Sequence, residues 1–222
     1  EDYDVLKVDS GPGHVYEVEA TDGTLDAWHR LWDEAKLGFN SDEAYYRIQG
    51  LNPDGTPNPA YETMVDIDNL IDYMLVIFYG GNLDSPITWY GQDNYPNNFY
   101  VFYNRNSPDG FKSLIHDSEH TLLLGNIHGM DELYRDRTGP FSCGNDKPYS
   151  NPQWIHQQLV AHPDYRREFG DRAHRHFFNG GLLTPEVAES RFMNRAYQIE
   201  LAVIAESARW GDFLESYYSY AY

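Results

Sequence analysis

One segment near the middle of the chain is apolar on nearly every side and limits how the rest can fold. Residues 70–79 read LIDYMLVIFY; Asp66 and Asp68 precede them, and a Gly-Gly pair follows. Either aspartate can cap a helix and the glycines end it, so the pattern predicts a helix. A helix without a polar face is buried, and we expect other elements to surround this one. The chain leaves it through a short loop that ends in Asp84.

A β-hairpin is predicted after that loop. Residues 99–103 and 111–115 carry aromatic and β-branched side chains, and NRNSPDG between them supplies turn residues. The second strand leads into the run HDSEH, which contains Asp117 and Glu119. Two carboxylates two positions apart on extended backbone face the same side, so both could reach one hard cation. The unit 66–120 is therefore interpreted as a holder of acidic side chains around a metal-bound phosphate.

Each of these residues also has a purely structural interpretation. Asp84 alone fits a turn or a helix cap, and Asn98 fits a turn before the first strand. Asp117 and Glu119 fit a solvated strand end. The two histidines of HDSEH suggest zinc, but the familiar zinc pair lies on a helix with Glu directly after the first His. That arrangement is missing here, so an oxygen-ligand site of the magnesium type is favoured.

The segments on either side of residues 66–120 are predicted to be an N-terminal hairpin that leads into the domain and a group of C-terminal helices that supports it. Residues 1–20 predict a hairpin with strands at 4–8 and 14–19 around a Gly-Pro-Gly turn. Residues 121–150 are rich in loop signals, with a short helix near 130–135. The other predicted helices are 24–37 after Asp22, 42–49 after Ser41, and three within 151–211 that begin at Asn151–Pro152, Pro163 and Thr184–Pro185.

The last predicted helix is assigned a stop and a buried face. Gly211 is expected to end it after Trp210. Apolar residues at helical spacing predict a stripe that faces the core. The stripe consists of Val187, Phe192, Ala196, Ile199, Val203 and Ile204.

Charge and composition exclude several classes of partner. The formal net charge is −19 and the pI is about 4.6, so duplex nucleic acid and anionic lipid would be repelled. Such a surface suits cations, neutral polymers or basic proteins. A single cysteine, Cys143, excludes an internal disulfide framework. No apolar run reaches about 18 residues, so no membrane span is predicted.

The order of helix, loop acid, hairpin amide and second acid is the order found in C-terminal lobes of protein-kinase-like folds. The runs LIDYMLVIFYGGNLD, NNFYVFYNRN and GFKSLIHDSEHTL resemble the spore coat protein H (CotH) kinase family. The later runs FFNGGLLTPEVAESRF and VIAESARWGD do so as well. This family is an atypical, secreted or coat-associated branch of the kinase-like fold, whose members phosphorylate protein serines with ATP and a divalent metal.

The resemblance implies a role for each residue. Asp84 matches the catalytic-loop acid, Asn98 the metal-side amide, and Asp117 with Glu119 the metal-binding acidic pair. The implied cofactors are ATP and Mg²⁺ or Mn²⁺, and the implied substrate is a serine-containing protein. A secreted or cell-surface location in bacteria is implied too. We accordingly expect residues 1–222 to form a single α+β domain, mainly helical, that corresponds to a kinase-like C-terminal lobe.

The sequence also departs from a complete kinase pattern. It holds no Gly-rich phosphate loop and no strand Lys with a helix Glu partner, so the N-terminal lobe is expected before Glu1. An insertion, Ser85–Pro96, separates the loop acid from the hairpin. Two alternatives therefore stay open. One is a non-catalytic extracellular or coat scaffold that keeps the fold; the other is a glycan-acting module, which needs two carboxyls about 5–9.5 Å apart.

Overall fold

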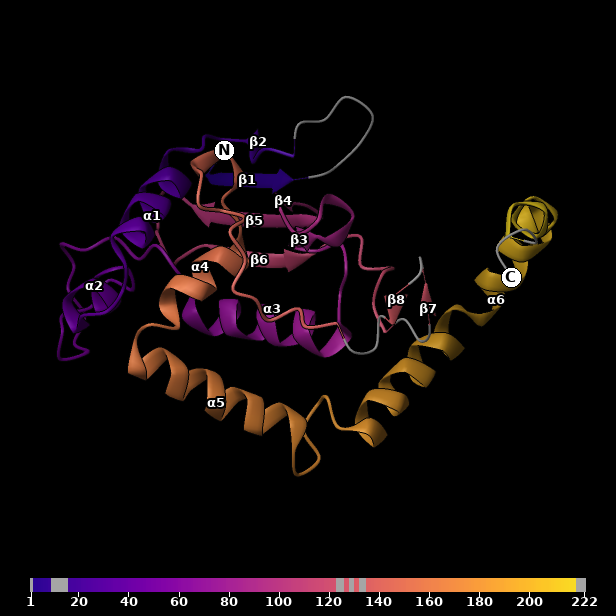
Figure 1. The fold of residues 1–222 in the computed structure, drawn as a ribbon. Coiled ribbons are helices and arrows are strands. Elements are labelled where there is room, and N and C mark those ends of the chain that lie inside the picture. Colours follow the sequence, from indigo (N-terminus) through magenta and orange to yellow (C-terminus); the bar gives the residue numbers. More distant parts are fainter. Residues whose placement is uncertain (1, 9–15, 123–125, 128–129, 132–134, 219–222) are drawn as a thin grey trace. The chain divides into compact units, whose positions relative to one another are not determined.

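Figure 1 shows the chain as a computed structural model, which describes residues 2–8, 16–122, 126–127, 130–131 and 135–218. The chain divides into two compact units, Glu1–Arg172 and Ala173–Tyr222, which are described one at a time. The fold is mixed α/β. In the described residues, no helix is both long enough and apolar enough to cross a membrane.

A four-stranded antiparallel sheet organises the first unit, with strand order β2-β1-β5-β6. The strands are β1 (Tyr3–Val8), β2 (Glu19–Asp22), β5 (Phe99–Asn104) and β6 (Lys112–Ile115). Leu6 of β1 lies opposite Val101 of β5, and both side chains are fully buried. The predicted hairpin of residues 99–103 and 111–115 is confirmed by the β5–β6 pairing.

The predicted N-terminal hairpin is only partly right. Strand β1 forms, but its partner is Glu19–Asp22 and not residues 14–19. All four residues of β2 are exposed, so no alternation of polar and apolar side chains marked it as a strand. Val18 is buried and donates its N–H to the carbonyl of Pro148 instead of to the sheet. The predicted turn at residues 11–13 lies outside the described residues.

Helix α3 (Ile67–Gly80) is largely buried, as its apolar sequence predicts, although Val76 and Tyr79 are exposed. Asp66 caps it by accepting from the N–H of Asn69, and Gly81 ends it with a left-handed φ of 58°. The helix packs against β6 and against α4 (Pro152–Leu159). Its fully or nearly fully buried side chains are Leu70, Ile71, Tyr73, Met74, Leu75 and Ile77.

Helices α1 (Asp26–Leu37) and α2 (Asp42–Arg47) precede it. Ser41 caps α2 as predicted, with its side chain accepting from the N–H of Ala44. The predicted cap of α1 is wrong. Asp22 accepts from the neighbouring N–H of Gly23 instead, and the N-cap position is taken by Leu25, which makes no side-chain bond.

The segment between α3 and the hairpin folds into a small ribbon. Strands β3 (Ile87–Thr88) and β4 (Tyr95–Pro96) pair around the 3-10 helix η1 (Trp89–Gly91). The predicted insertion is therefore a structured element. The predicted short helix near 130–135 is wrong where it is described, because β8 (Met130–Asp131) pairs with β7 (Asn126–Ile127); residues 132–134 lie outside the described part.

Helices α4 and α5 (Pro163–Phe177) begin at the predicted prolines. Asn151 caps α4 by accepting from the N–H of Trp154 at 2.9 Å. Arg172 of α5 binds α3 by donating from Nε and Nη2 to the two carboxylate oxygens of Asp72, at 2.8 and 2.7 Å. The same guanidinium reaches Asp68 at 2.6 Å. A 3-10 helix η3 (Lys147–Tyr149) precedes α4.

The second unit consists mainly of α6 (Pro185–Tyr218), which begins at Pro185 as predicted. The predicted stop is wrong, because the helix continues through Gly211. One helical glycine costs only about 1 kcal/mol relative to alanine, which does not end a long helix. The predicted core-facing stripe is also wrong. Phe192 is 72% exposed and Ile204 is 60% exposed, because the spacing defines a helix face but not what covers it.

Candidate active site

The loop after α3 is held by the side chain of Asn82. Its Oδ1 accepts from the N–H of Asp84 at 2.8 Å and from that of Ser85 at 3.0 Å. This is an Asx turn, and it fixes the backbone of Asp84 while the carboxylate stays half-buried. Asn82 was not predicted as a functional residue. An Asn two positions before an Asp in a Gly-Gly-Asn-Leu-Asp run was the available signal.

Asn98 connects the two predicted acidic positions. Its Nδ2 donates to Oδ2 of Asp84 at 2.9 Å and lies 3.5 Å from the carbonyl oxygen of Asp117. The carboxylate can only accept, so it fixes which way the amide points. Asn98 is 3% exposed and has a φ of 49°, a left-handed conformation that Asn tolerates better than most residues. The structure thus brings Asp84, Asn98 and Asp117 together.

A buried hydroxyl holds Asn98 from the loop side. Ser85 donates from Oγ to the carbonyl of Asn98 at 2.7 Å, and the hydroxyl of Tyr73 lies 3.3 Å from the same Oγ. Burial raises the pKa of Tyr73 well above its usual value, so its hydroxyl stays protonated. These contacts tie the loop acid, the hairpin amide and the core of α3 into one network.

Asp117 and Glu119 are arranged differently from the prediction. The backbone bends at Asp117 with a φ of 43°, so the extended geometry assumed for this pair is not met. The carboxylate of Asp117 is exposed and makes no hydrogen bond or ion pair with the described residues. Glu119 is exposed and lies 3.2 Å from Nε2 of His120. Of the four predicted site residues in the described part of the chain, Glu119 is the one that contacts neither Asp84 nor Asn98.

The two histidines of this segment have partners of their own. The ring of His116 packs edge-on against Tyr100, with centroids 4.9 Å apart. His120 lies 3.2 Å from the hydroxyl of Tyr90 through Nδ1. Across the described residues, no three His, Cys, Asp or Glu side chains form a group that could hold a metal ion. The residues of this site that could serve a metal are therefore an amide and carboxylates, with the Asp117 carbonyl beside them.

The segment that carries Asp117 lies directly against the end of α3. Leu83 donates its N–H to the carbonyl of His120 at 3.1 Å, and Leu122 donates to the carbonyl of Gly80 at 2.7 Å. A Cβ added to Gly80 would meet Cγ2 of Thr121 at 2.5 Å. This close approach favours a glycine at position 80, and it sets the loop acid beside the second acidic segment.

Arg137 anchors the loop, and no motif in the sequence marked it as a functional residue. Its guanidinium is almost fully buried, donating from Nε to the carbonyl of Asn82 at 3.0 Å and from Nη1 to Asp93 at 2.6 Å. Nη2 donates to the carbonyl of Ile87. Burial lowers the pKa of Arg137, and Asp93 opposes that shift by stabilising the charged form. The ribbon that contains Asp93 therefore supplies the counter-charge that lets this arginine hold the loop.

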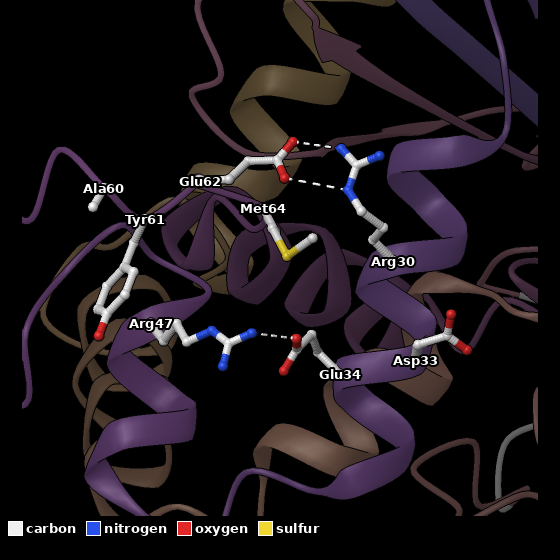
Figure 2. Close-up of a pocket in the computed structure, with 8 residues that line it drawn as sticks. All are labelled: Arg30, Asp33, Glu34, Arg47, Ala60, Tyr61, Glu62 and Met64. Atoms are coloured by element: carbon white, nitrogen blue, oxygen red, sulfur yellow. Dashed lines mark hydrogen bonds and ion pairs between the residues drawn. The ribbon is translucent and has the colours of Figure 1, made fainter.

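A hollow is formed by α1, α2 and the segment 60–64, separate from these residues (Figure 2). It measures about 400 Å³, and Figure 2 shows that both of its arginines face glutamates. Arg30 reaches Glu62 at 2.7 Å, and Arg47 reaches Glu34 at 2.5 Å. Tyr103 of β5 also donates to Glu62, at 2.5 Å. These pairs connect the helices to the sheet, and none of the predicted site residues lines the hollow.

Comparisons with known proteins bear on the first of these sites. A family model described as CotH kinase protein matches residues 19–222, which include every predicted site residue. Neither the comparison with curated proteins nor the comparison with solved structures gave a match. Because the family match spans most of the sequence, the chain belongs to the CotH kinase protein family.

Proposed function

We propose that this chain carries the acceptor side and the metal side of a protein kinase site that transfers the γ-phosphate of ATP to protein serine. Membership of a kinase family supports phosphotransfer as the reaction class. The observation that carries the assignment to particular residues is the bridge made by Asn98, which contacts both Asp84 and Asp117. Phosphoryl transfer depends mainly on positioning and charge stabilisation; this network positions the acceptor-side acid and the side chains that would hold a charge-stabilising metal.

Asp84 is the acceptor-side acid in this proposal. Its backbone is fixed by Asn82, and one carboxylate oxygen is fixed by Asn98. The other oxygen has no hydrogen bond to the described residues, so it is available to a substrate hydroxyl. A carboxylate held in this way orients the serine hydroxyl and accepts its proton as the oxygen attacks.

The donor set fits a hard divalent cation. Asn98 uses Nδ2 for Asp84, which leaves its Oδ1 as a ligand, and the carboxylate of Asp117 is unpaired within the described part of the chain. Amide and carboxylate oxygens are ligands that Mg²⁺ and Mn²⁺ prefer. Asn98 and Asp117 would therefore hold the metal; Glu119, the other predicted ligand, pairs with His120 instead of contacting Asn98. When bound, the metal neutralises charge on the phosphates.

The substrate in this proposal is a basic, serine-containing protein. The chain carries 35 acidic and 16 basic residues, so a basic acceptor segment would be attracted. Family membership supports a secreted, cell-surface or coat location. ATP is the phosphate donor.

Nucleotide binding offers a direct test. The protein as its gene encodes it should melt at a higher temperature with ATP and Mg²⁺ than with either alone, since binding to the native state stabilises it. Asp117→Ala should remove that increase. Asp109→Asn is the matched control, because Asp109 is an exposed carboxylate at the hairpin turn that pairs with Lys112 at 2.5 Å. No increase in the wild-type protein would overturn the proposal and favour a non-catalytic scaffold.

A further inference from the structure

A pocket of about 570 Å³ lies at the end of α3, between α4 and α5, and has no role in the proposed phosphotransfer. It is lined by residues of these three helices and of the segment 138–140, and none of the candidate active-site residues lines it. Its volume is within the range of about 300–1,000 Å³ typical of small-molecule sites. All of its lining residues belong to the first unit.

Three aromatic rings form its apolar wall. The ring centroids of Phe78 and His156 are 5.7 Å apart, and those of His156 and Phe169 are 5.2 Å apart. Val160 and Pro140 add aliphatic surface. A planar or branched apolar group would find ring faces and edges at ordinary contact distances here.

His156 provides one hydrogen-bond donor in this apolar setting. Its side chain is nearly fully buried, and Nδ1 lies 2.6 Å from the hydroxyl of Tyr165. That hydroxyl is fully buried and has no other partner in the described residues, so it donates to Nδ1. The ring proton is then on Nε2, which no described residue binds. Burial lowers the pKa of His156 to about 4, so the ring is neutral at pH 7.

The charge of the lining favours an acceptor group on the ligand. Among the described residues, Arg166 is the one charged side chain that lines the pocket, and no carboxylate does, although the chain has 35 acidic residues. Nη1 of Arg166 donates to the carbonyls of Val160 and Ala161 at 2.7 and 2.8 Å. The rest of this exposed guanidinium remains for an anion, for which its planar fork is suited.

Gly170 lines the pocket on the α5 side. It lies inside helix α5, where glycine is among the least favourable residues. A Cβ added there would meet nothing within 4 Å, so packing does not require a glycine. A larger side chain at this position would therefore meet no clash, which makes Gly170 a suitable place to test occupancy of the pocket.

We propose that this pocket binds a small monocarboxylate with an aromatic or branched apolar body. The body packs against Phe78, His156 and Phe169. The carboxylate accepts hydrogen bonds from Nε2 of His156 and from Arg166. The site is separate from the phosphotransfer residues and does not depend on the proposed kinase activity.

The test compares 4-phenylbutyrate with the neutral 4-phenylbutan-1-ol by ligand-observed NMR titration of the wild-type chain. The carboxylate should bind roughly tenfold more tightly than the alcohol, as expected for one charge-assisted interaction. Gly170→Leu should abolish binding by filling the pocket, whereas Gly170→Ala should retain it. Arg166→Gln should bring the two affinities close together. Thermal melts of each variant show whether it is folded.

A nitrogen-15 spectrum of the histidines gives an independent readout, because it reports which ring nitrogen of His156 carries the proton. A proton on Nε2 supports the assignment, and a proton on Nδ1 overturns it. The proposal is also overturned if the wild type does not bind 4-phenylbutyrate, if the alcohol binds equally well, or if folded Gly170→Leu binds as the wild type does.

Discussion

Replacing Arg137 by Met tests whether this residue holds the catalytic loop. Methionine keeps a long, unbranched side chain at this position but lacks the guanidinium N–H groups. The carbonyls of Asn82 and Ile87 therefore lose the hydrogen-bond donors that Arg137 supplies. The change also removes the closest counter-charge of Asp93, whose side chain is 22% exposed; Arg135 remains 3.8 Å from it. The loop around Asp84 should therefore loosen, and the first unit should lose stability.

The magnitude follows from the burial of these groups. Breaking a buried ion pair costs about 3–5 kcal/mol, and a buried carbonyl left without a donor costs about 1–3 kcal/mol. Part of this is recovered, because the loop can relax and admit water and Arg135 stays near Asp93. We expect about 3 kcal/mol, which lowers the melting temperature of a domain of this size by roughly 6–12 °C.

The assay is urea and thermal unfolding followed by circular dichroism. Arg167→Met is the matched control, because Arg167 is an exposed arginine that pairs with Asp164 at 2.6 Å. A solvent-exposed ion pair contributes little to stability, so this variant should unfold almost as the wild type does. Asp93→Asn combined with Arg137→Met completes a double-mutant cycle. Equal effects of Arg137→Met and Arg167→Met would refute the anchoring role, as would a coupling energy near zero.

Three further changes test other contacts. Asn98→Asp places a second carboxylate where the amide now donates to Asp84 at 2.9 Å, so it should cost about 2 kcal/mol at pH 8 and less on acidification; a loss that does not change with pH would contradict this reasoning. Gly80→Ala should cost about 1–3 kcal/mol through its contact with Cγ2 of Thr121, and Thr121→Ser should restore most of that loss in urea titrations. His156 binds a proton more readily when unfolded, since its folded pKa is lowered to about 4, so its contribution is complete above pH 6.5 and is lost as the pH falls toward 4. Stability against pH should therefore be flatter in His156→Gln over that interval, by up to about 3 kcal/mol, and an unchanged slope would argue against the buried neutral ring.

The parts of the fold that the sequence predicted are those with strong local signals. The apolar run of α3 and the caps at Ser41, Asp66 and Asn151 are encoded within a few residues, and each is confirmed. The hairpin is encoded in the same way, by two strand-like runs around turn residues. Strand β2 was placed wrongly because its exposed polar residues carry no alternation, and only pairing with β1 makes it a strand.

In the candidate site, too, features with a local sequence signal were predicted and features set by tertiary contacts were not. The positions of Asp84, Asn98 and Asp117 along the chain followed from the order of helix, loop and hairpin, and the structure brings them together. The bend at Asp117 could not be predicted, because a left-handed φ outside glycine depends on tertiary contacts. Arg137 lies 53 residues after Asp84 in sequence, so only the folded chain brings it into contact with the loop.

The most direct test of the central claim is transfer of labelled γ-phosphate from ATP to a basic, serine-containing protein. The assay uses the protein as its gene encodes it, with Mg²⁺ present. We predict phosphoserine formation that falls by about two to four orders of magnitude in Asp84→Asn and in Asp117→Asn. Asp109→Asn should retain the wild-type rate. Transfer that persists unchanged in folded Asp84→Asn and Asp117→Asn would contradict the assignment of these residues to the reaction.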